Sequence, residues 1–151
     1  MDYIREAENV LWYYNNIYNS LANLDLQIAQ LIRSQGPKEL TAVHMDITGV
    51  RGGPTYTTEQ ALYKLQVLQN CRQESLLALD KIDEQLQQIS QERGCEQYGR
   101  VLRLWYVEKL DKDSIAEALG YANKRDAYRM RDRAIRKFAV NHFGINAVTA
   151  M

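Results

Sequence analysis

Cysteine, histidine and proline are scarce in this sequence, which has two of each among its 151 residues, with eight glycines. Cys71 and Cys95 form no Cys-X-X-Cys pair, and His44 and His142 add no metal-ligand spacing, so we expect no metal site. No apolar run approaches the ~20 residues of a membrane span, and the first residues lack the basic-then-apolar pattern of a secretory signal. We therefore expect free thiols in a reducing, cytoplasmic compartment, and no membrane contact.

Residue groupings that carry catalysis are also missing. The segment 49–53 lacks the lysine of a Walker phosphate loop and stands between expected helices rather than after a strand. No set of a serine, a histidine and an acidic residue occurs at a spacing usual for catalysis, and neither does a cysteine–histidine pair. We expect no enzymatic activity, no catalytic residue and no cofactor.

The charge is balanced overall but unevenly distributed. The chain has 19 Lys and Arg against 19 Asp and Glu. Residues 1–95 contain eight basic and twelve acidic residues, whereas residues 96–138 contain eleven basic and seven acidic residues. Within 121–138, seven basic residues stand against two acidic ones. The total predicts no particular partner, but the distribution points to 121–138 as a binding segment.

The N-terminal part has the apolar spacing of long helices. Across residues 2–34 apolar side chains recur every three or four positions, which predicts one amphipathic helix that Gly36-Pro37 ends. Thr57 and Gln60 predict a capping box for a second helix, which we expect to end near Gly94. Its heptad seam consists of Leu65, Leu68, Leu79, Ile82, Leu86 and Ile89.

Neither helix can bury its apolar stripe alone. We therefore predict a coiled-coil-like antiparallel hairpin over 1–94, serving as an assembly element, and the sequence equally admits a homodimer through the same helices. Residues 35–57 lose the helical period and contain both prolines and four of the eight glycines. We interpret them as a long loop, and the sequence leaves its role open.

Residues 95–143 predict three shorter helices, at 96–108, 112–119 and 124–142, followed by a small tail at 144–151. Asp111 is placed to cap the second of these helices, and Asn123 to cap the third. Gly120 can adopt the positive φ that the turn between them needs. The predicted fold is all-α, with a helical hairpin followed by a three-helix helix-turn-helix domain.

The third of these helices places its charges and its apolar residues on opposite sides. At 100° per residue, Ala127, Met130, Ala134 and Phe138 share one side. An arginine row occupies the other side, consisting of Arg125, Arg129, Arg133 and Arg136. Guanidinium groups bind phosphates and the O6 and N7 atoms of guanine, so the pattern favours a helix that lies in the major groove of DNA.

Three segments carry a family resemblance. They are 101–110 (VLRLWYVEKL), 114–120 (SIAEALG) and 128–138 (YRMRDRAIRKF). They resemble region 4 of bacterial sigma factors, and are still more similar to the sigma-like late-transcription regulators of phages and prophages, of the ArpU and RinA type. The resemblance implies a phage or prophage regulator of transcription that binds promoter DNA in the cytoplasm of a bacterial host cell, with RNA polymerase as a candidate second partner. The sequence contains no counterpart of sigma region 2, so we do not expect a complete sigma factor.

We accordingly predict a sequence-specific regulator that binds double-stranded DNA. The sequence also admits a DNA-packaging protein of the small-terminase kind, or a helical adaptor that binds polymerase without reading DNA. The expected DNA-contacting residues are Asn123, Lys124, Arg125, Asp126, Tyr128, Arg129, Arg133 and Arg136. The target sequence, and whether transcription rises or falls, stay open.

Overall fold

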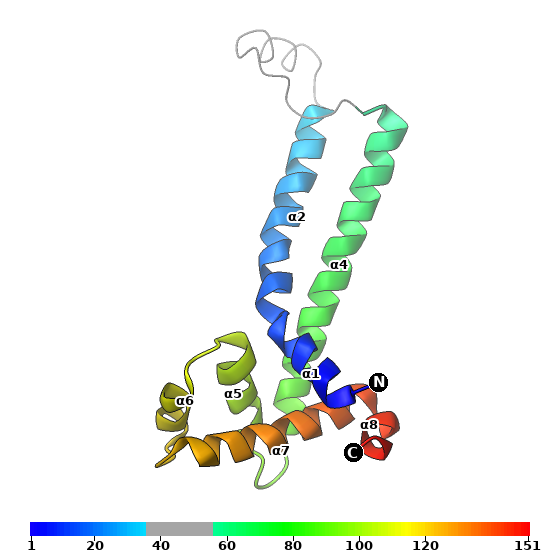
Figure 1. Ribbon diagram of the computed structural model, residues 1–151. Coiled ribbons are helices and arrows are strands. Elements are labelled where there is room, and N and C mark those ends of the chain that lie inside the picture. Colours follow the sequence, from blue (N-terminus) through cyan, green and yellow to red (C-terminus); the bar gives the residue numbers. More distant parts are fainter. Residues whose placement is uncertain (36–55) are drawn as a thin grey trace. The chain divides into compact units, whose positions relative to one another are not determined.

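A computed structural model describes residues 1–35 and 56–151, and Figure 1 shows that these residues form helices joined by turns. The all-α class is confirmed for these two ranges, which contain no strand. The segment 36–55, most of the predicted loop, lies outside the described residues together with His44 and the glycines of 49–53. The helices are α1 (Tyr3–Trp12), α2 (Tyr14–Ser34), α4 (Thr58–Ile89), α5 (Tyr98–Leu102), α6 (Lys112–Leu119), α7 (Lys124–Phe143) and α8 (Ile145–Thr149).

The chain forms two compact units. Unit 1 comprises residues 1–17 and 78–151, and unit 2 comprises residues 18–77. This division differs from the boundary at 94/95 that the sequence suggested. The physical reason is that one core of unit 1 contains Ala7 and Leu11 from α1 and Leu86 from α4, packed with residues of the C-terminal helices.

Unit 2 contains parts of α2 and α4 that lie side by side and run in opposite directions (Figure 1). Its core is small, with only Leu31, Ala61 and Leu68 buried among the described residues. An ion pair of 2.6 Å between Asp25 and Arg72 marks the register of the two helices. The unit therefore rests on a single narrow seam.

The second long helix begins where the sequence predicts. The Thr57 hydroxyl accepts a hydrogen bond of 3.2 Å from the Gln60 N–H, and the Gln60 side chain accepts one of 3.1 Å from the Thr57 N–H. The predicted capping box is thus confirmed. The helix ends at Ile89, before Gly94, which has a φ of +88° in the turn that follows.

Two other predicted helices differ in detail. The helix expected over 2–34 is divided at Tyr13, which has a φ of −85° and a ψ of 2°. The helix expected over 96–108 consists of α5 and a π-helical turn, η1 (Arg103–Val107). In η1 the Glu108 N–H donates to the Arg103 carbonyl five residues back, at 2.8 Å. This wider turn accompanies three consecutive buried side chains, those of Leu104, Trp105 and Tyr106.

The tail also has structure. Residues 145–149 form α8, in which Ala147 is buried in the core of unit 1. Gly144 precedes this helix with a φ of +70°. None of the described helices is apolar over enough of its length to cross a membrane.

Candidate nucleic-acid interface

Both ends of α6 are fixed, the first by a side-chain cap and the last by a glycine turn. Asp111 accepts a hydrogen bond of 2.7 Å from the Ser114 N–H at the start of α6. This bond lowers the pKa of the Asp111 carboxyl, because it stabilises the charged form. At the other end, Gly120 has a φ of +79° and the Tyr121 N–H donates to the Ala116 carbonyl at 2.8 Å. The turn that follows is therefore closed by a glycine C-cap.

Helix α7 starts at the cap that the sequence predicts. The Asn123 side chain accepts a hydrogen bond of 3.2 Å from the Asp126 N–H. Asn123 itself has extended backbone angles, as N-cap residues do. The predicted range 124–142 differs from the observed helix by one residue. A cap on each helix leaves a connection of only four residues, 120–123, which limits how α6 and α7 are placed.

The apolar side of α7 lies in the core of unit 1. Ala127, Ala134, Ile135 and Phe138 are buried, and the partly buried Met130 packs against the same cluster. Ala134 and Phe138 have no measurable exposure. The predicted apolar side is confirmed, and the opposite side of the helix therefore faces away from the core.

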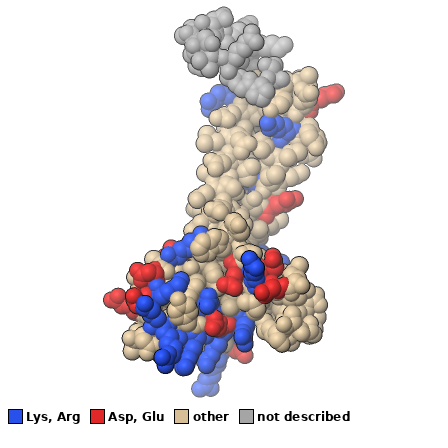
Figure 2. Space-filling view, viewed as in Figure 1, with Lys and Arg blue, Asp and Glu red and all other residues tan. Residues whose placement is uncertain are grey.

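The arginine row occupies that opposite side. Arg125, Arg129, Arg133 and Arg136 are all exposed. At 100° per residue their side chains fall within an arc of about 80°, and the row extends along α7 for about 16 Å at 1.5 Å per residue. None of the four forms an ion pair or a side-chain hydrogen bond with another residue in the ranges 1–35 and 56–151. Figure 2 shows the Lys and Arg side chains gathered over this part of unit 1.

Other basic residues of the segment interact with the chain's own groups. Lys137 pairs with Glu92, and Lys124 Nζ lies 3.6 Å from an Asp113 carboxylate oxygen. Arg131 donates to Asp132 at 2.9 Å. The positive charge counted over 121–138 is thus partly neutralised, and what stays unpaired is concentrated in the arginine row.

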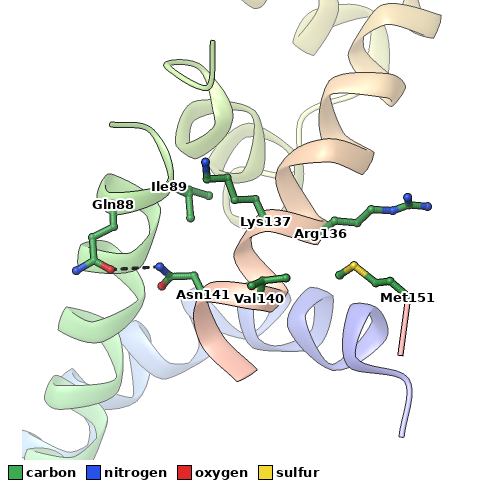
Figure 3. Close-up of a pocket in the computed structure, with 7 residues that line it drawn as sticks. All are labelled: Gln88, Ile89, Arg136, Lys137, Val140, Asn141 and Met151. Atoms are coloured by element: carbon green, nitrogen blue, oxygen red, sulfur yellow. Dashed lines mark hydrogen bonds between the residues drawn. The ribbon is translucent and has the colours of Figure 1, made fainter. Parts of the chain in front are cut away.

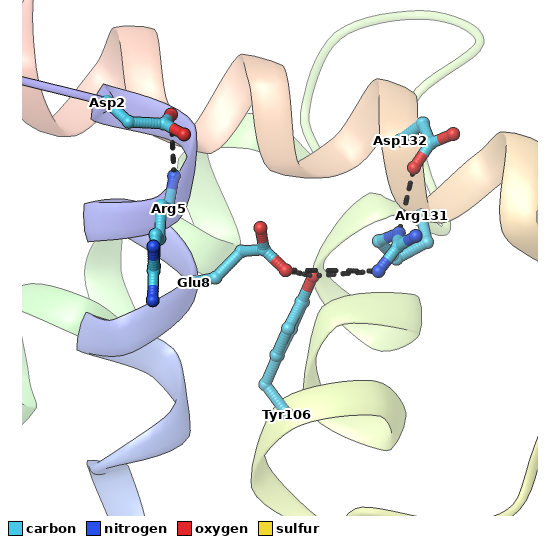
Figure 4. Close-up of polar contacts among 6 residues, drawn as sticks. All are labelled: Asp2, Arg5, Glu8, Tyr106, Arg131 and Asp132. Carbon is cyan, nitrogen blue, oxygen red and sulfur yellow. Dashed lines mark hydrogen bonds and ion pairs between the residues drawn. The ribbon is translucent and has the colours of Figure 1, made fainter.

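Arg131 belongs to a polar cluster that joins three helical elements of unit 1 (Figure 4). The Tyr106 hydroxyl donates to Glu8 at 2.8 Å and accepts from Arg131 at 3.3 Å. Burial raises the pKa of Tyr106, so this hydroxyl stays protonated and keeps its donor role. The cluster holds α1 and η1 against α7, and the role of Arg131 is structural.

The ring of Trp105, in η1, contacts residues of α6 and α7. Lys112 Nζ lies 4.0 Å from the ring centroid, and the Arg131 guanidinium lies 4.8 Å from it. Burial, and then the nearby charge of Arg131, lower the pKa of Lys112. The Tyr128 ring packs edge-on against Trp105 with 4.9 Å between centroids, and its side chain is 40% exposed. Tyr128 is therefore held by the core and also presented beside the arginine row.

The expected DNA-contacting residues occupy different environments. Asn123 is exposed but its side-chain oxygen is used for the cap, and Lys124 is paired with Asp113. Asp126 is half-buried. Tyr128 and the arginine row are brought together on one side of α7. The sequence could not show that Lys124 would be paired. Asp113 lies eleven positions away, whereas side chains on one helix pair at a spacing of three or four residues.

A shallow pocket of about 370 Å³ lies beside the last turns of α7 (Figure 3). Asn141 donates to Gln88 across it at 3.4 Å, and Arg136 and Lys137 border it. No acidic residue or histidine lines this pocket. Across the described ranges, no three His, Cys, Asp or Glu side chains come together in a way that could hold a metal ion.

No protein-family model, curated protein or solved structure matches this chain. The geometry of α6, α7 and the arginine row is therefore the basis for assigning a function.

Proposed function

We propose that this protein is a sequence-specific transcriptional regulator that binds double-stranded DNA through the exposed side of α7. The single observation that carries the proposal is the arginine row: four exposed guanidinium groups on one side of a helix, without ion-pair partners in the described ranges. An ordinary solvated helix surface interleaves charges of both signs, whereas this side of α7 has four arginines and one acid, Asp132, which is bonded to Arg131. A row of unpaired positive charges instead matches a negatively charged surface such as the phosphate backbone of DNA.

The dimensions of the row suit a DNA groove. An α-helix with its side chains is about 10–12 Å across, and the major groove is about 12 Å wide. The row extends for about 16 Å along α7. Its guanidinium groups can therefore contact phosphates on both edges of the groove, and those nearest the floor can pair with guanine.

The start of α7 supports sequence selectivity. In a helix-turn-helix the first turns of the second helix contact base edges, and here these turns contain Arg125, Asp126 and Tyr128. The glycine C-cap of α6 and the Asn123 cap of α7 hold this end in one geometry. The role at promoters, with RNA polymerase as a second partner, is proposed from the resemblance of the segments 101–110, 114–120 and 128–138 to phage and prophage regulators.

A triple variant tests the proposal. Arg125→Ala, Arg129→Ala and Arg133→Ala together should weaken binding to random and selected duplexes, measured by fluorescence anisotropy. A matched control removes three exposed cations outside α7, in the variant Arg5→Ala, Arg33→Ala and Lys81→Ala. We expect the control to bind nearly as tightly as the wild type, which separates the row from general charge. Equal affinity of the wild type and the triple variant would contradict the proposal.

The same material tests the partners. Duplexes selected from a random pool, with and without RNA polymerase, would give the target sequence and show whether polymerase changes it. Capture of polymerase by a protein that retards no duplex would instead favour the helical adaptor. A ring-shaped assembly on DNA would favour a packaging protein.

A further inference from the structure

Unit 2 has a second apolar side that its own core does not use. On α2, apolar residues recur at 18, 22, 26, 29 and 32, and they lie on a different side of the helix from the buried Leu31. Tyr18, Leu26 and Ile32 are 57–61% exposed. On α4, Leu62 and Leu77 are 61% and 57% exposed. More large apolar side chains are exposed in this unit than buried in its seam.

These residues share one face of the hairpin. At 100° per residue, Tyr18 and Leu62 each lie about 100° around their helix from the residues that face the other helix. In an antiparallel pair, equal rotations on the two helices turn toward the same side. We call this side the apolar face; it contains Tyr18, Ala22, Leu26, Ala29 and Ile32 of α2 and Leu62, Gln66, Gln69, Gln73 and Leu77 of α4.

The apolar face carries little charge. Its ten positions include no Lys, Arg, Asp or Glu, and two exposed residues of opposite charge, Arg33 of α2 and Glu59 of α4, lie within the same arcs of the two helices. Asp25, which lies between Ile32 and Tyr18 around α2, is paired within the chain with Arg72. A face without net charge does not repel a copy of itself, whereas the surface of a solvated helix normally carries charges. The pattern is that of an interface between subunits.

We propose that the apolar face binds the apolar face of a second copy of this chain, forming a four-helix bundle with a two-fold axis along the hairpin. The register set by Asp25 and Arg72 places residues whose numbers add to about 95–97 at the same height. Under this two-fold axis, α2 of one copy packs on α4 of the other at equal height. Ile32 then meets the partner's Leu62, and Tyr18 meets the partner's Leu77.

The sizes of the facing residues match in this arrangement. Ala22 faces the partner's Gln73, and Ala29 faces the partner's Gln66, so a small side chain opposes a long one at each level. The two helices of the face are about 25 Å long and together about 20 Å wide. The two copies therefore bury on the order of 1,000 Å² in total, about the lower size for a specific interface.

Sedimentation velocity of the full chain tests this without DNA, and so independently of the proposed function. The wild type should have twice the chain mass at about 100 μM, a concentration chosen because interfaces at this lower end of the size range associate weakly. Ile32→Glu and Leu62→Lys should each give the monomer mass. Val67→Glu is the matched control, since Val67 is 40% exposed on α4 but lies about 140° around the helix from Leu62.

Mixing the two interface variants gives the sharper result. In the mixed dimer the introduced glutamate of one copy would face the introduced lysine of the other at one contact, and the second contact keeps Ile32 and Leu62. The mixture should therefore regain the dimer mass that each variant lacks. A monomeric wild type, which would leave the face to another partner, would overturn the proposal. A dimeric Ile32→Glu protein, loss of the dimer in Val67→Glu, or a mixture that stays monomeric would also overturn it.

Discussion

Gly99 and Ser90 are joined by a hydrogen bond of 2.8 Å from the Gly99 N–H to the Ser90 hydroxyl oxygen. Ser90 in turn donates to the Leu86 carbonyl at 2.8 Å. A Cβ on residue 99 would lie 2.6 Å from both the Leu86 carbonyl oxygen and the Ser90 hydroxyl oxygen. Only glycine therefore allows α5 to approach the end of α4 this closely.

Gly99→Ala should destabilise the protein by about 2 kcal/mol or more, because backbone as well as a side chain must move. Urea unfolding followed by circular dichroism measures this. Ser90→Ala should cost about 1–2 kcal/mol, since it leaves the Gly99 N–H without its partner. The double variant should be less destabilised than the sum of the two, because one of the two clashes is gone. If the two effects add fully, the Ser90 hydroxyl is not what a Cβ at residue 99 meets.

The sequence predicted the local features of the fold well. The Thr57–Gln60 box and the Asp111 and Asn123 caps are each formed by residues three positions apart, so their spacing is readable. The buried side of α7 was readable for the same reason. The π-helical turn at 103–107 has no such pattern, because its Tyr106 side chain bonds to Glu8 of α1 and to Arg131 of α7, far away in the sequence.

The division into units was not readable either. Arg72 and Ser75 interrupt the apolar seam of α4 between Leu68 and Leu79. This interruption did not by itself show that Leu68 packs in unit 2 and Leu86 in unit 1. The candidate site was predicted in outline, since the arginine row is where its spacing placed it. Arg131 pairs with Glu8, which is far away in the sequence. No local pattern could therefore distinguish Arg131 from the unpaired arginines.

Tyr106→Phe should cost about 1–2 kcal/mol in the free energy of unfolding. The Tyr106 side chain is only 3% exposed, and loss of its hydroxyl leaves Glu8 without its donor. Tyr128→Phe is the matched control, because no hydrogen bond of its hydroxyl is present in the described ranges and the side chain is 40% exposed. Equal stability of the two variants would show that the polar cluster does not hold α1 in place.

Acidification should weaken the fold through His142. Its Nδ1 lies 2.9 Å from the Gln85 side-chain oxygen. Burial, and then the charge of Lys81, lower the pKa of His142 in the folded state. The unfolded chain therefore takes up the proton first, and the contribution is complete above the unfolded pKa of about 6.5 and is lost as pH falls through the folded value.

Urea unfolding on both sides of that pKa checks this prediction. We expect the wild type to lose stability between about pH 7.5 and pH 5.5, and His142→Gln to lose less over the same interval. The interval lies above the range in which Asp and Glu titrate in unfolded chains. An identical pH dependence in both proteins would assign the loss to other groups.

The salt dependence of DNA binding should separate the members of the arginine row. Each phosphate contact that is removed should reduce the slope of log Kobs against log salt by about 0.9. We expect Arg133→Ala and Arg136→Ala to lower the slope while leaving the preferred sequence unchanged, because they lie away from the start of α7. Arg125→Ala should instead relax the choice at one base pair, at a cost of about 1–3 kcal/mol for the preferred duplex. Lys124→Ala should change little, since Lys124 is already paired with Asp113. Anisotropy titrations at several salt concentrations on selected and scrambled duplexes measure both effects, and slopes that are equal in all five proteins would show that the row does not contact the DNA backbone.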